Sequence, residues 1–266
     1  MTHPETGGTT APRGARARRQ AMLDHLIQAG SAQVDELASR FQVSRMTIHR
    51  DLDELVAQGM VQKQHGGATT RASSIFESNF SLRRHIAVAE KHALAQAALA
   101  EIHEGESVVL DDSTTAAALA ALLPSRKPLT VITNGLESIE PLRSANGIKL
   151  ITLGGEYQPR FNATFGLLCE QTIASLRANV AVLSASAILG TTAYVQDPAV
   201  TQIKRAQMAA AERRILLVHS AKFGRSALHR LADLTEFDLV LIDSGLAGEY
   251  RQALDDVSVS YRLITS

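Results

Sequence analysis

Apolar residues recur every three or four positions in the first quarter of the chain, a period that predicts helices. The predicted helices span residues 16–29, 33–41 and 45–58. Ser31 and Ser44 stand where N-caps of the second and third helices are expected. Gly30 and Gly59 stand where the first and third should stop. The pattern therefore predicts three short helices separated by tight breaks.

A short strand is expected at residues 60–64, followed by a turn at His65-Gly66-Gly67. Residues 16–70 would then form one compact unit of three helices and a small hairpin. Residues 1–15 are rich in Gly, Thr and Pro and are predicted to be a disordered tail. Residues 71–86 are mostly polar, with a few apolar anchor points, and are predicted to be a linker.

From residue 87 the periodicity changes. An Ala-rich helix at residues 87–104 precedes short, continuous apolar runs that alternate with helical stretches. The strands are expected at residues 107–110, 129–133, 148–153, 180–184, 214–218, 238–242 and 257–264. Continuous apolar strands that alternate with helices are typical of a mostly parallel sheet covered on both faces. Residues 87–266 are therefore predicted to form a larger α/β domain.

Composition narrows the class of protein. The chain has 266 residues, of which 45% are apolar and 20% charged, as in an ordinary soluble globular protein. Cys169 is the sole cysteine, so no intrachain disulfide is possible. No apolar run approaches the roughly 18–20 residues that span a bilayer, and the first residues lack the apolar segment of a secretory signal. We therefore expect a cytoplasmic protein with no membrane partner.

The formal net charge is zero, so the charge total does not indicate a polyanionic partner. The position of the charges on the third predicted helix is more informative. On a helical wheel, Ile48, Leu52, Leu55 and Val56 form one apolar stripe, whereas Met46 and Arg50 point roughly the opposite way. Two helices joined by a tight turn, the second with polar groups on its N-terminal half, have the geometry that enters a DNA major groove.

This geometry gives each candidate a role. An Arg in the first two turns can pair with guanine, whereas Thr47 and the amides behind the Ser44 cap suit phosphates. The hairpin would be a wing that approaches the DNA backbone. The candidate DNA contacts are Ser44, Arg45, Met46, Thr47, His49, Arg50, Lys63, His65, Gly66 and Gly67. Spacing alone leaves a second interpretation open, a three-helix bundle with a solvated charged face. Asp51, Asp53 and Glu54 count against a broad phosphate-binding face.

Polar loops follow the first three predicted strands of the α/β domain, at residues 111–115, 133–135 and 153–157. The carboxyl ends of parallel strands meet at one edge of a sheet, where ligands bind in open α/β folds. Ser113 to Thr115 open a helix, Asn134 adds a neutral donor and acceptor, and Lys222 follows a later strand. Each signal alone is commonly a helix cap, a turn or a solvated charge. Their convergence favours an anion-binding site.

The stretch VDELASRFQVSRMTIHRDLDELVAQGMVQKQHGGA resembles the winged helix-turn-helix of DeoR-family transcriptional regulators. The family pattern is matched by Val43, Ser44, Thr47, Ile48, Arg50, Asp51, Leu52, Gly59, Val61, Lys63, His65, Gly66, Gly67 and Ala68. The chain departs from it at His49, where the family usually has Arg. The resemblance implies that this unit binds a double-stranded DNA operator.

The second domain resembles the effector domain of the same family, so that the likeness covers about residues 16–243. The matching stretches are Glu90-Lys91, LDDSTT, VITNG, LGGEY, Gly166, KRAQM and KFG. The resemblance implies a fold similar to ribose-phosphate isomerases and CoA transferases, a phosphorylated sugar or related metabolite as effector, and a homo-dimer or homo-tetramer. By motif position, the implied effector contacts are Asp111, Ser113, Thr114, Thr115, Asn134, Gly154, Gly155 and Lys222.

Three departures from the family pattern bear on the effector. Ser113 stands where the family usually has Gly, and Asn179 and His219 stand where it often has Asp. We expect these changes to alter the charge and space around the pocket, and hence to favour an effector unlike the common ones.

Two functions follow from these features. The first is a ligand-responsive transcriptional regulator, most simply a repressor of carbohydrate-metabolism genes. The alternative is a sugar-phosphate isomerase-like enzyme with an added DNA-binding head, in which Asp111, Asp112 or Glu156 would serve as the base. No second catalytic partner stands at an informative spacing, so we predict no catalytic residue, no cofactor and no metal site.

Overall fold

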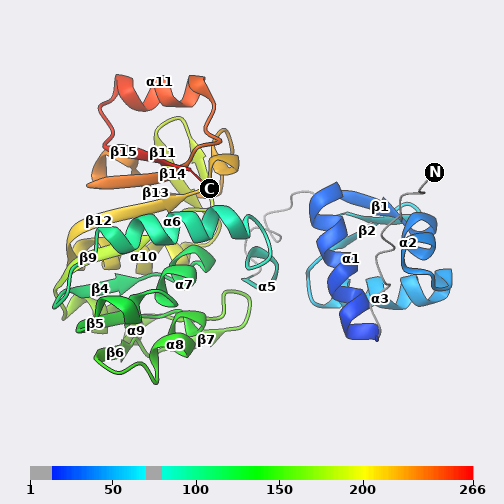
Figure 1. The fold of residues 1–266 in the computed structure, drawn as a ribbon, viewed down its shortest axis with the longest axis horizontal. Helices are drawn as coiled ribbons and strands as arrows, with labels where there is room; N and C mark the ends of the chain where they lie inside the picture. The colour runs from blue at the N-terminus through cyan, green and yellow to red at the C-terminus, as the bar shows by residue number, and fades with distance from the viewer. Residues whose placement is uncertain (1–13, 70–79, 266) are drawn as a thin grey trace, which may run out of the picture. The chain divides into compact units, whose positions relative to one another are not determined.

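The computed structural model describes residues 14–69 and 80–265 (Figure 1). The chain divides into two compact units between Ile86 and Ala87. Most of the predicted tail and the first part of the predicted linker lie outside the described residues. The rest of that linker includes a short helix, α5 (Phe80–Arg83), whose Leu82 belongs to the core of the first unit.

Before α5, the described part of the first unit consists of three helices and a small sheet. The helices are α1 (Ala15–Ala29), α2 (Val34–Phe41) and α3 (Arg45–Ala57). The strands β1 (Ser31–Gln33), β2 (Gln62–Gln64) and β3 (Gly67–Thr69) form an antiparallel sheet in the order β1-β3-β2. Apolar side chains of all three helices meet in one core, which includes Met22, Leu26, Leu37, Phe41, Ile48, Leu52 and Leu55. The predicted winged helix-turn-helix is confirmed.

The predicted N-cap at Ser31 is wrong. Ser31 lies in β1, opposite Thr69 of β3, and α2 begins only at Val34. Gln33 precedes that helix without a side-chain cap. Residues 31–33 are extended because their backbone groups pair with a strand that lies far along the sequence, which a local helical pattern does not reveal.

A close backbone approach holds β1 against the hairpin. A Cβ atom at Gly67 would lie 2.2 Å from the backbone oxygen of Ala32, so no larger residue fits there without a shift. Gly66 in the preceding turn has a φ of +76°, a conformation that favours glycine. The glycine pair of the hairpin therefore shapes the wing.

A seven-stranded parallel sheet forms the centre of the second unit, in the order β15-β14-β12-β9-β4-β5-β6. Its strands are β4 (Ser107–Leu110), β5 (Leu129–Thr133), β6 (Ile148–Thr152), β9 (Ala178–Leu183), β12 (Ala211–Val218), β14 (Leu239–Asp243) and β15 (Tyr261–Ile264). All seven predicted strands are present, β4 and β5 with the predicted bounds and the other five with shifted ends. The predicted parallel α/β architecture is confirmed.

Helices cover both faces of this sheet. On one face lie α6 (Val88–Ala100), α7 (Thr114–Ala120) and α8 (Leu136–Leu142), and on the other α9 (Leu167–Ala174), α10 (Pro198–Ala210) and α11 (Gly248–Asp256). Figure 1 shows α6 lying across the strands. In β4, Val108 and Leu110 pack in the core under α6, α7 and α8, whereas Val109 between them packs in the core under α9, α10 and α11. This burial on both faces explains the continuous apolar runs.

Smaller elements complete the unit. A hairpin is formed by β7 (Glu156–Gln158) and β8 (Ala163–Phe165), and a three-stranded sheet by β10 (Ala187–Leu189), β11 (Thr192–Val195) and β13 (His229–Asp233). Short 3₁₀ turns are η1 (Leu123–Arg126), η2 (Ser220–Lys222) and η3 (Leu234–Glu236). Within the two described stretches, none of the helices has the length and apolar character needed to cross a bilayer.

Candidate functional site

The N-terminus of α3 is fixed by a hydroxyl cap. Ser44 has extended backbone, and its Oγ accepts a hydrogen bond of 3.2 Å from the backbone N–H of Thr47. The two hydroxyl oxygens of Ser44 and Thr47 lie 2.9 Å apart. Gln42, with a left-handed backbone, ends α2 two residues earlier. Turn and cap together set the direction in which α3 leaves α2.

The polar face of α3 is open to solvent. Ile48, Leu52 and Leu55 are buried in the core, as the helical wheel predicts. Val56, at the end of the predicted stripe, is 37% exposed, so the prediction is wrong for that residue. The exposed side chains of the first two turns are Arg45, Met46, His49 and Arg50, with Thr47 half-buried between them. Arg45 Nε lies 2.8 Å from Asp35 Oδ1 of α2, and both side chains remain exposed. The structure thus gathers five of the predicted DNA contacts on one surface, which we call the reading face.

The acidic residues of α3 all have cationic partners. Asp51 is buried, and its Oδ2 accepts a hydrogen bond of 2.6 Å from Arg18 Nε of α1. Asp53 pairs with Lys63 of the wing, and a carboxylate oxygen of Glu54 lies 3.8 Å from a guanidinium nitrogen of Arg19. These pairs neutralise the carboxylates that would otherwise oppose phosphate binding. The acidic residues of α3 therefore count less against phosphate binding than the sequence alone indicates.

The wing presents only part of the predicted set. Lys63, His65 and Gly66 are exposed. Gly67 is buried against β1, so its role in the structure is to let two strands approach rather than to offer a surface.

The second group of candidates lies at the carboxyl edge of the parallel sheet. The crossovers from β4 through α7 to β5, and through α8 to β6, run along one face, whereas β9 reaches β12 through α10 on the other. From β4 the chain adds β5 and β6 on one side, and from β9 it adds β12 and β14 on the other. The order of strand addition therefore reverses between the adjacent strands β4 and β9. In open α/β sheets such a reversal splays the following loops apart and makes a ligand crevice.

Asp111, directly after β4, holds this edge together. Its Oδ1 accepts the backbone N–H of Ser113 at 2.9 Å, and its Oδ2 accepts the backbone N–H of Ser184, after β9, at 2.7 Å. The same Oδ2 accepts a hydrogen bond from Lys204 Nζ of α10. Lys204 Nζ also lies 3.2 Å from Asp112 Oδ1. One buried lysine therefore neutralises two buried carboxylates.

Burial alone would lower the pKa of Lys204, but the carboxylates of Asp111 and Asp112 outweigh it and raise the pKa above its usual value. The motif KRAQM carries part of the family resemblance, but the sequence pattern alone assigns Lys204 no role. A signal was present, because Lys204 lies beside Ile203 and Met208 on the buried side of an amphipathic helix. A lysine on an apolar stripe is rarely buried unless a partner faces it.

Asn134, after β5, is joined to the same helix. Its Oδ1 accepts a hydrogen bond of 3.0 Å from Gln207 Nε2, and its Nδ2 donates to the backbone oxygen of Thr164 at 3.0 Å. Gln207 lies one turn after Lys204 and is completely buried. Its Oε1 has no hydrogen-bond partner within the described residues. Leaving a buried acceptor without a hydrogen bond costs about 1–3 kcal/mol of stability. The side-chain oxygen of Gln207 is therefore available to accept a hydrogen bond from a ligand.

Cationic side chains lie near the carboxyl ends of β9 and β12. Lys222 Nζ donates to Ser184 Oγ at 3.2 Å and to the backbone oxygen of Ala185 at 2.5 Å. Burial, together with the charges of Lys222, Lys91 and Arg225, lowers the pKa of His219 to about 2. His219 is therefore neutral at physiological pH, and the surrounding cations favour an anion.

The glycines after β6 have a more local explanation. A Cβ atom at Gly155 would lie 2.3 Å from the backbone oxygen of Phe165, and the residue has a φ of +137°. The close approach that this glycine permits is thus to its own chain. A Cβ atom at Gly154 would meet nothing within 4 Å, so no close approach requires a glycine there.

The three departures fall in different places. Ser113 Oγ accepts the N–H of Ala116 at 3.0 Å and so caps α7. His219 follows β12 at the carboxyl edge. Asn179 does not lie near them: it stands at the start of β9, at the amino edge, where its Oδ1 accepts from Ser107 Oγ at 2.8 Å. The expectation that Asn179 changes the charge around the pocket is therefore wrong.

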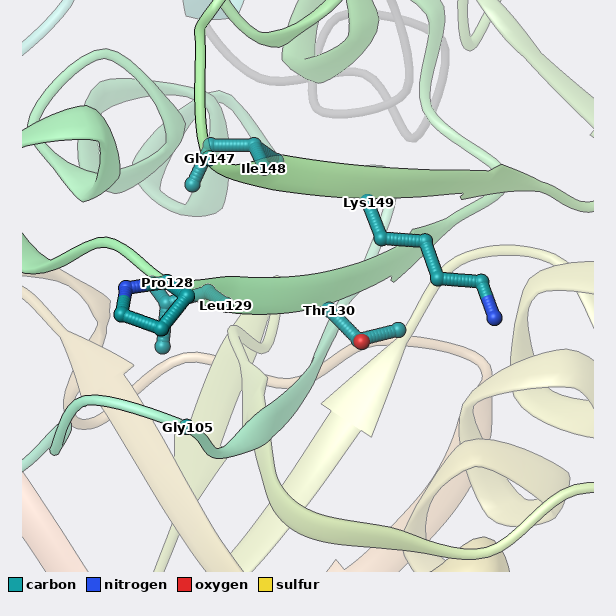
Figure 2. A pocket seen from close by; sticks show the side chains of 7 residues that line it. All are labelled: Gly105, Pro128, Leu129, Thr130, Gly147, Ile148 and Lys149. Carbon is teal, nitrogen blue, oxygen red and sulfur yellow. The ribbon is translucent and has the colours of Figure 1, made fainter.

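A depression of about 400 Å³ lies at the amino ends of β5 and β6, away from these candidates. Figure 2 shows the side chains of Thr130 and Lys149 extending from the two neighbouring strands. The remaining lining residues are Gly105, Pro128, Leu129, Gly147 and Ile148. With one exposed cation and no buried polar group, this surface offers little to hold a ligand.

A helix with an exposed polar face beside a hairpin, followed by a parallel α/β unit with a polar carboxyl edge, defines a class: DNA-binding transcriptional regulators with an N-terminal winged helix. Comparison with known families refines this. Residues 18–74 match the DeoR-like helix-turn-helix domain, and residues 86–244 match the DeoR C-terminal sensor domain. The chain belongs to the DeoR family of transcriptional regulators.

Relatives match over most of their length. The L-fucose operon activator of Haemophilus influenzae is 34% identical, over 86% of this chain and 92% of the relative. A putative aga operon transcriptional repressor of Escherichia coli O157:H7 is 29% identical over 99% of both chains. The glycerol-3-phosphate regulon repressor of Escherichia coli K12 is 28% identical, over 92% of this chain and 98% of the relative.

Solved structures with a similar arrangement are more distant. Ribose 5-phosphate isomerase A from Methanocaldococcus jannaschii matches 51% of this chain and 54% of its own, with 18% identity and a TM-score of 0.38. The eIF2B beta subunit from Chaetomium thermophilum matches 87% of this chain and 81% of its own, with 16% identity and a TM-score of 0.41. We draw no functional conclusion from these two.

Proposed function

We propose that this chain represses carbohydrate-metabolism genes by binding a double-stranded operator, and that a phosphorylated sugar or related metabolite at the carboxyl edge of the sheet changes its affinity for DNA. Relatives named for fucose, aga and glycerol-3-phosphate regulation support the class of gene and of metabolite. The exposed reading face with its neutralised carboxylates supports the DNA partner.

The observation that carries the effector proposal is the arrangement of charge around Ser184. Lys204 is buried on Asp111 and Asp112, and Lys222 bonds to Ser184 itself. An anionic ligand would compete with the carboxylates for these ammonium groups. A sugar hydroxyl that reached Gln207 Oε1 would supply the donor that this buried acceptor lacks within the described residues. This edge therefore offers ammonium groups to a phosphate and a hydrogen-bond acceptor to a sugar hydroxyl.

The mechanism we propose is a shift between conformations. Lys204 and Gln207 lie on α10, so a ligand that replaces their present partners would move or release this helix. An effector changes DNA affinity only if it favours one arrangement of the protein over another. In a homo-dimer or homo-tetramer, the arrangement that matters is the spacing of two reading faces relative to the operator half-sites.

Ser113 bears on which metabolite binds. Its side chain is buried and caps α7, so it occupies space that a glycine would leave free. We propose on this basis an effector other than an ordinary ketohexose phosphate. A large thermal shift with fructose phosphates would count against this part of the proposal.

The test is a thermal-shift screen of sugars, each with and without a phosphate, followed by gel shifts on the DNA upstream of the gene. We expect only phosphorylated members to stabilise the protein and to change the amount of DNA complex. Lys222→Met should weaken the effector response more than tenfold. Lys149→Met, an exposed lysine on the amino edge of the same sheet, is the matched control and should leave it unchanged.

Equal responses to phosphorylated and unphosphorylated sugars, or equal effects of the two lysine substitutions, would overturn the effector site. A gel shift with no sequence-specific, salt-sensitive complex would overturn the regulator itself. The enzyme alternative has no observation in its favour: Asp111 and Asp112 are held by Lys204, and the relatives that match along the whole chain are named as regulators.

A further inference from the structure

Met46 is the most exposed large apolar side chain of the first unit's described residues, with 75% of its surface accessible. It occupies the second position of α3, and the core stripe of that helix lies on the opposite side. Single exposed apolar residues are common and usually need no explanation. The position of Met46 is unusual because charged and hydrogen-bonding side chains surround it on the reading face.

The neighbours of Met46 on that face are polar. His49 and Arg50 lie three and four residues later, one helical turn away, and both are exposed. Arg50 has no ion-pair partner among the described residues, whereas Arg45 is engaged with Asp35. When this face enters a groove, Met46 is carried in beside an arginine that is free to read a base.

The chemistry of a thioether limits what Met46 can do there. It has no hydrogen-bond donor, and its sulfur is only a weak acceptor, so it reads no donor or acceptor of a base edge well. Base edges in the major groove offer one methyl group, on C5 of thymine. Covering that methyl group removes apolar surface of both partners from water, which is favourable. Any other base leaves Met46 without this gain.

We propose that Met46 is a specificity-determining residue that contacts the 5-methyl group of a thymine in each operator half-site. The inference rests on the proposed DNA binding and adds to it the identity of one base. A separation of four residues along a helix is about 6 Å, and base pairs stack about 3.4 Å apart. The thymine therefore lies about two base pairs from the base that Arg50 reads.

The experiment replaces thymine by uracil, which lacks only the methyl group. The full chain is first used to select operator duplexes from a random pool. Each thymine of a half-site is then changed singly to uracil, and dissociation constants are measured by fluorescence anisotropy for the wild type and Met46→Ala. Val56→Ala is the matched control, because Val56 is an exposed apolar residue at the other end of the same helix.

We expect one thymine per half-site at which uracil weakens wild-type binding about fourfold, the equivalent of one buried methyl group. At that position Met46→Ala should bind the thymine and uracil duplexes equally. Val56→Ala should keep the wild-type difference. The inference is overturned if uracil has no effect at any thymine, or if Met46→Ala stays as sensitive to uracil as the wild type. A pool that yields no preferred sequence would instead overturn the DNA-reading role, and this inference with it.

Discussion

Buried charges in this protein are compensated at the level of single residues. Arg18 neutralises Asp51 inside the first unit, and Lys204 neutralises Asp111 and Asp112 inside the second. Removing one member of such a pair leaves the other buried and uncompensated, which costs about 3–5 kcal/mol. His219 needs no such partner, because burial and the surrounding cations keep its side chain neutral.

The neutrality of His219 predicts a pH dependence of stability. Its pKa is about 2 in the folded chain but near 6.5 in the unfolded chain. Above about pH 6.5 neither state is protonated and the group has no effect. As the pH falls below that value, the unfolded chain binds a proton that the folded chain does not accept, so stability is lost.

Between pH 7 and pH 5, the wild type should therefore lose about 2 kcal/mol more unfolding free energy than His219→Gln, measured by urea denaturation. His103→Gln is the control, since the side chain of His103 is 71% exposed. Its pH profile should follow that of the wild type. Parallel profiles for the wild type and His219→Gln would show that His219 is not held neutral.

At the scale of elements, the wing depends on how closely β1 approaches β3. Gly67→Ala would place a methyl group 2.2 Å from the backbone oxygen of Ala32 and so force the two strands apart. We expect a loss of about 1–3 kcal/mol in unfolding free energy and weaker operator binding. None of the side chains on the reading face is changed by this substitution.

Gly248→Ala is the matched control, because nothing lies within 4 Å of the added methyl group and the residue is in the second unit. It should leave both unfolding and DNA binding as they are, measured by denaturation and anisotropy. If Gly67→Ala bound the operator like the wild type, the position of the wing would not matter for DNA binding.

What the sequence predicts at this scale is what local contacts determine. The helix α3 could be placed because its apolar stripe and its Ser44 cap lie within a few residues of each other. The strand β1 could not, because its partner β3 lies more than thirty residues later. For the same reason Lys204 was missed: the carboxylate it neutralises, Asp111, is 93 residues away.

At the scale of the whole molecule, the described residues of the first unit share one core, and those of the second pack in two, one on each face of the sheet. The two cores of the second unit share the same strands and should unfold together, whereas the first unit packs around a core of its own and should unfold separately, because cooperativity depends on shared packing. Calorimetry of the full chain should therefore resolve two transitions. Operator DNA should raise one of them, and a phosphorylated effector the other, since a ligand stabilises the unit that binds it.

Two substitutions assign the transitions. Asp51→Asn removes the negative charge opposite Arg18 and should lower only the transition that DNA raises, by more than about 10 °C. Lys204→Met leaves Asp111 and Asp112 uncompensated and should lower only the other. A single transition that both substitutions shift together would mean that the two units unfold as one.

The order of the sheet also has a consequence in time. The first unit has its buried core once the chain reaches Leu82, whereas the larger sheet waits for β15, which begins at Tyr261. At roughly 5–20 residues per second, a ribosome needs about 10–40 s to make the residues between them. Each newly made copy is thus expected to hold a folded reading face before any part of the chain can respond to a metabolite. We therefore expect newly made copies to bind DNA without responding to a metabolite until β15 is in place.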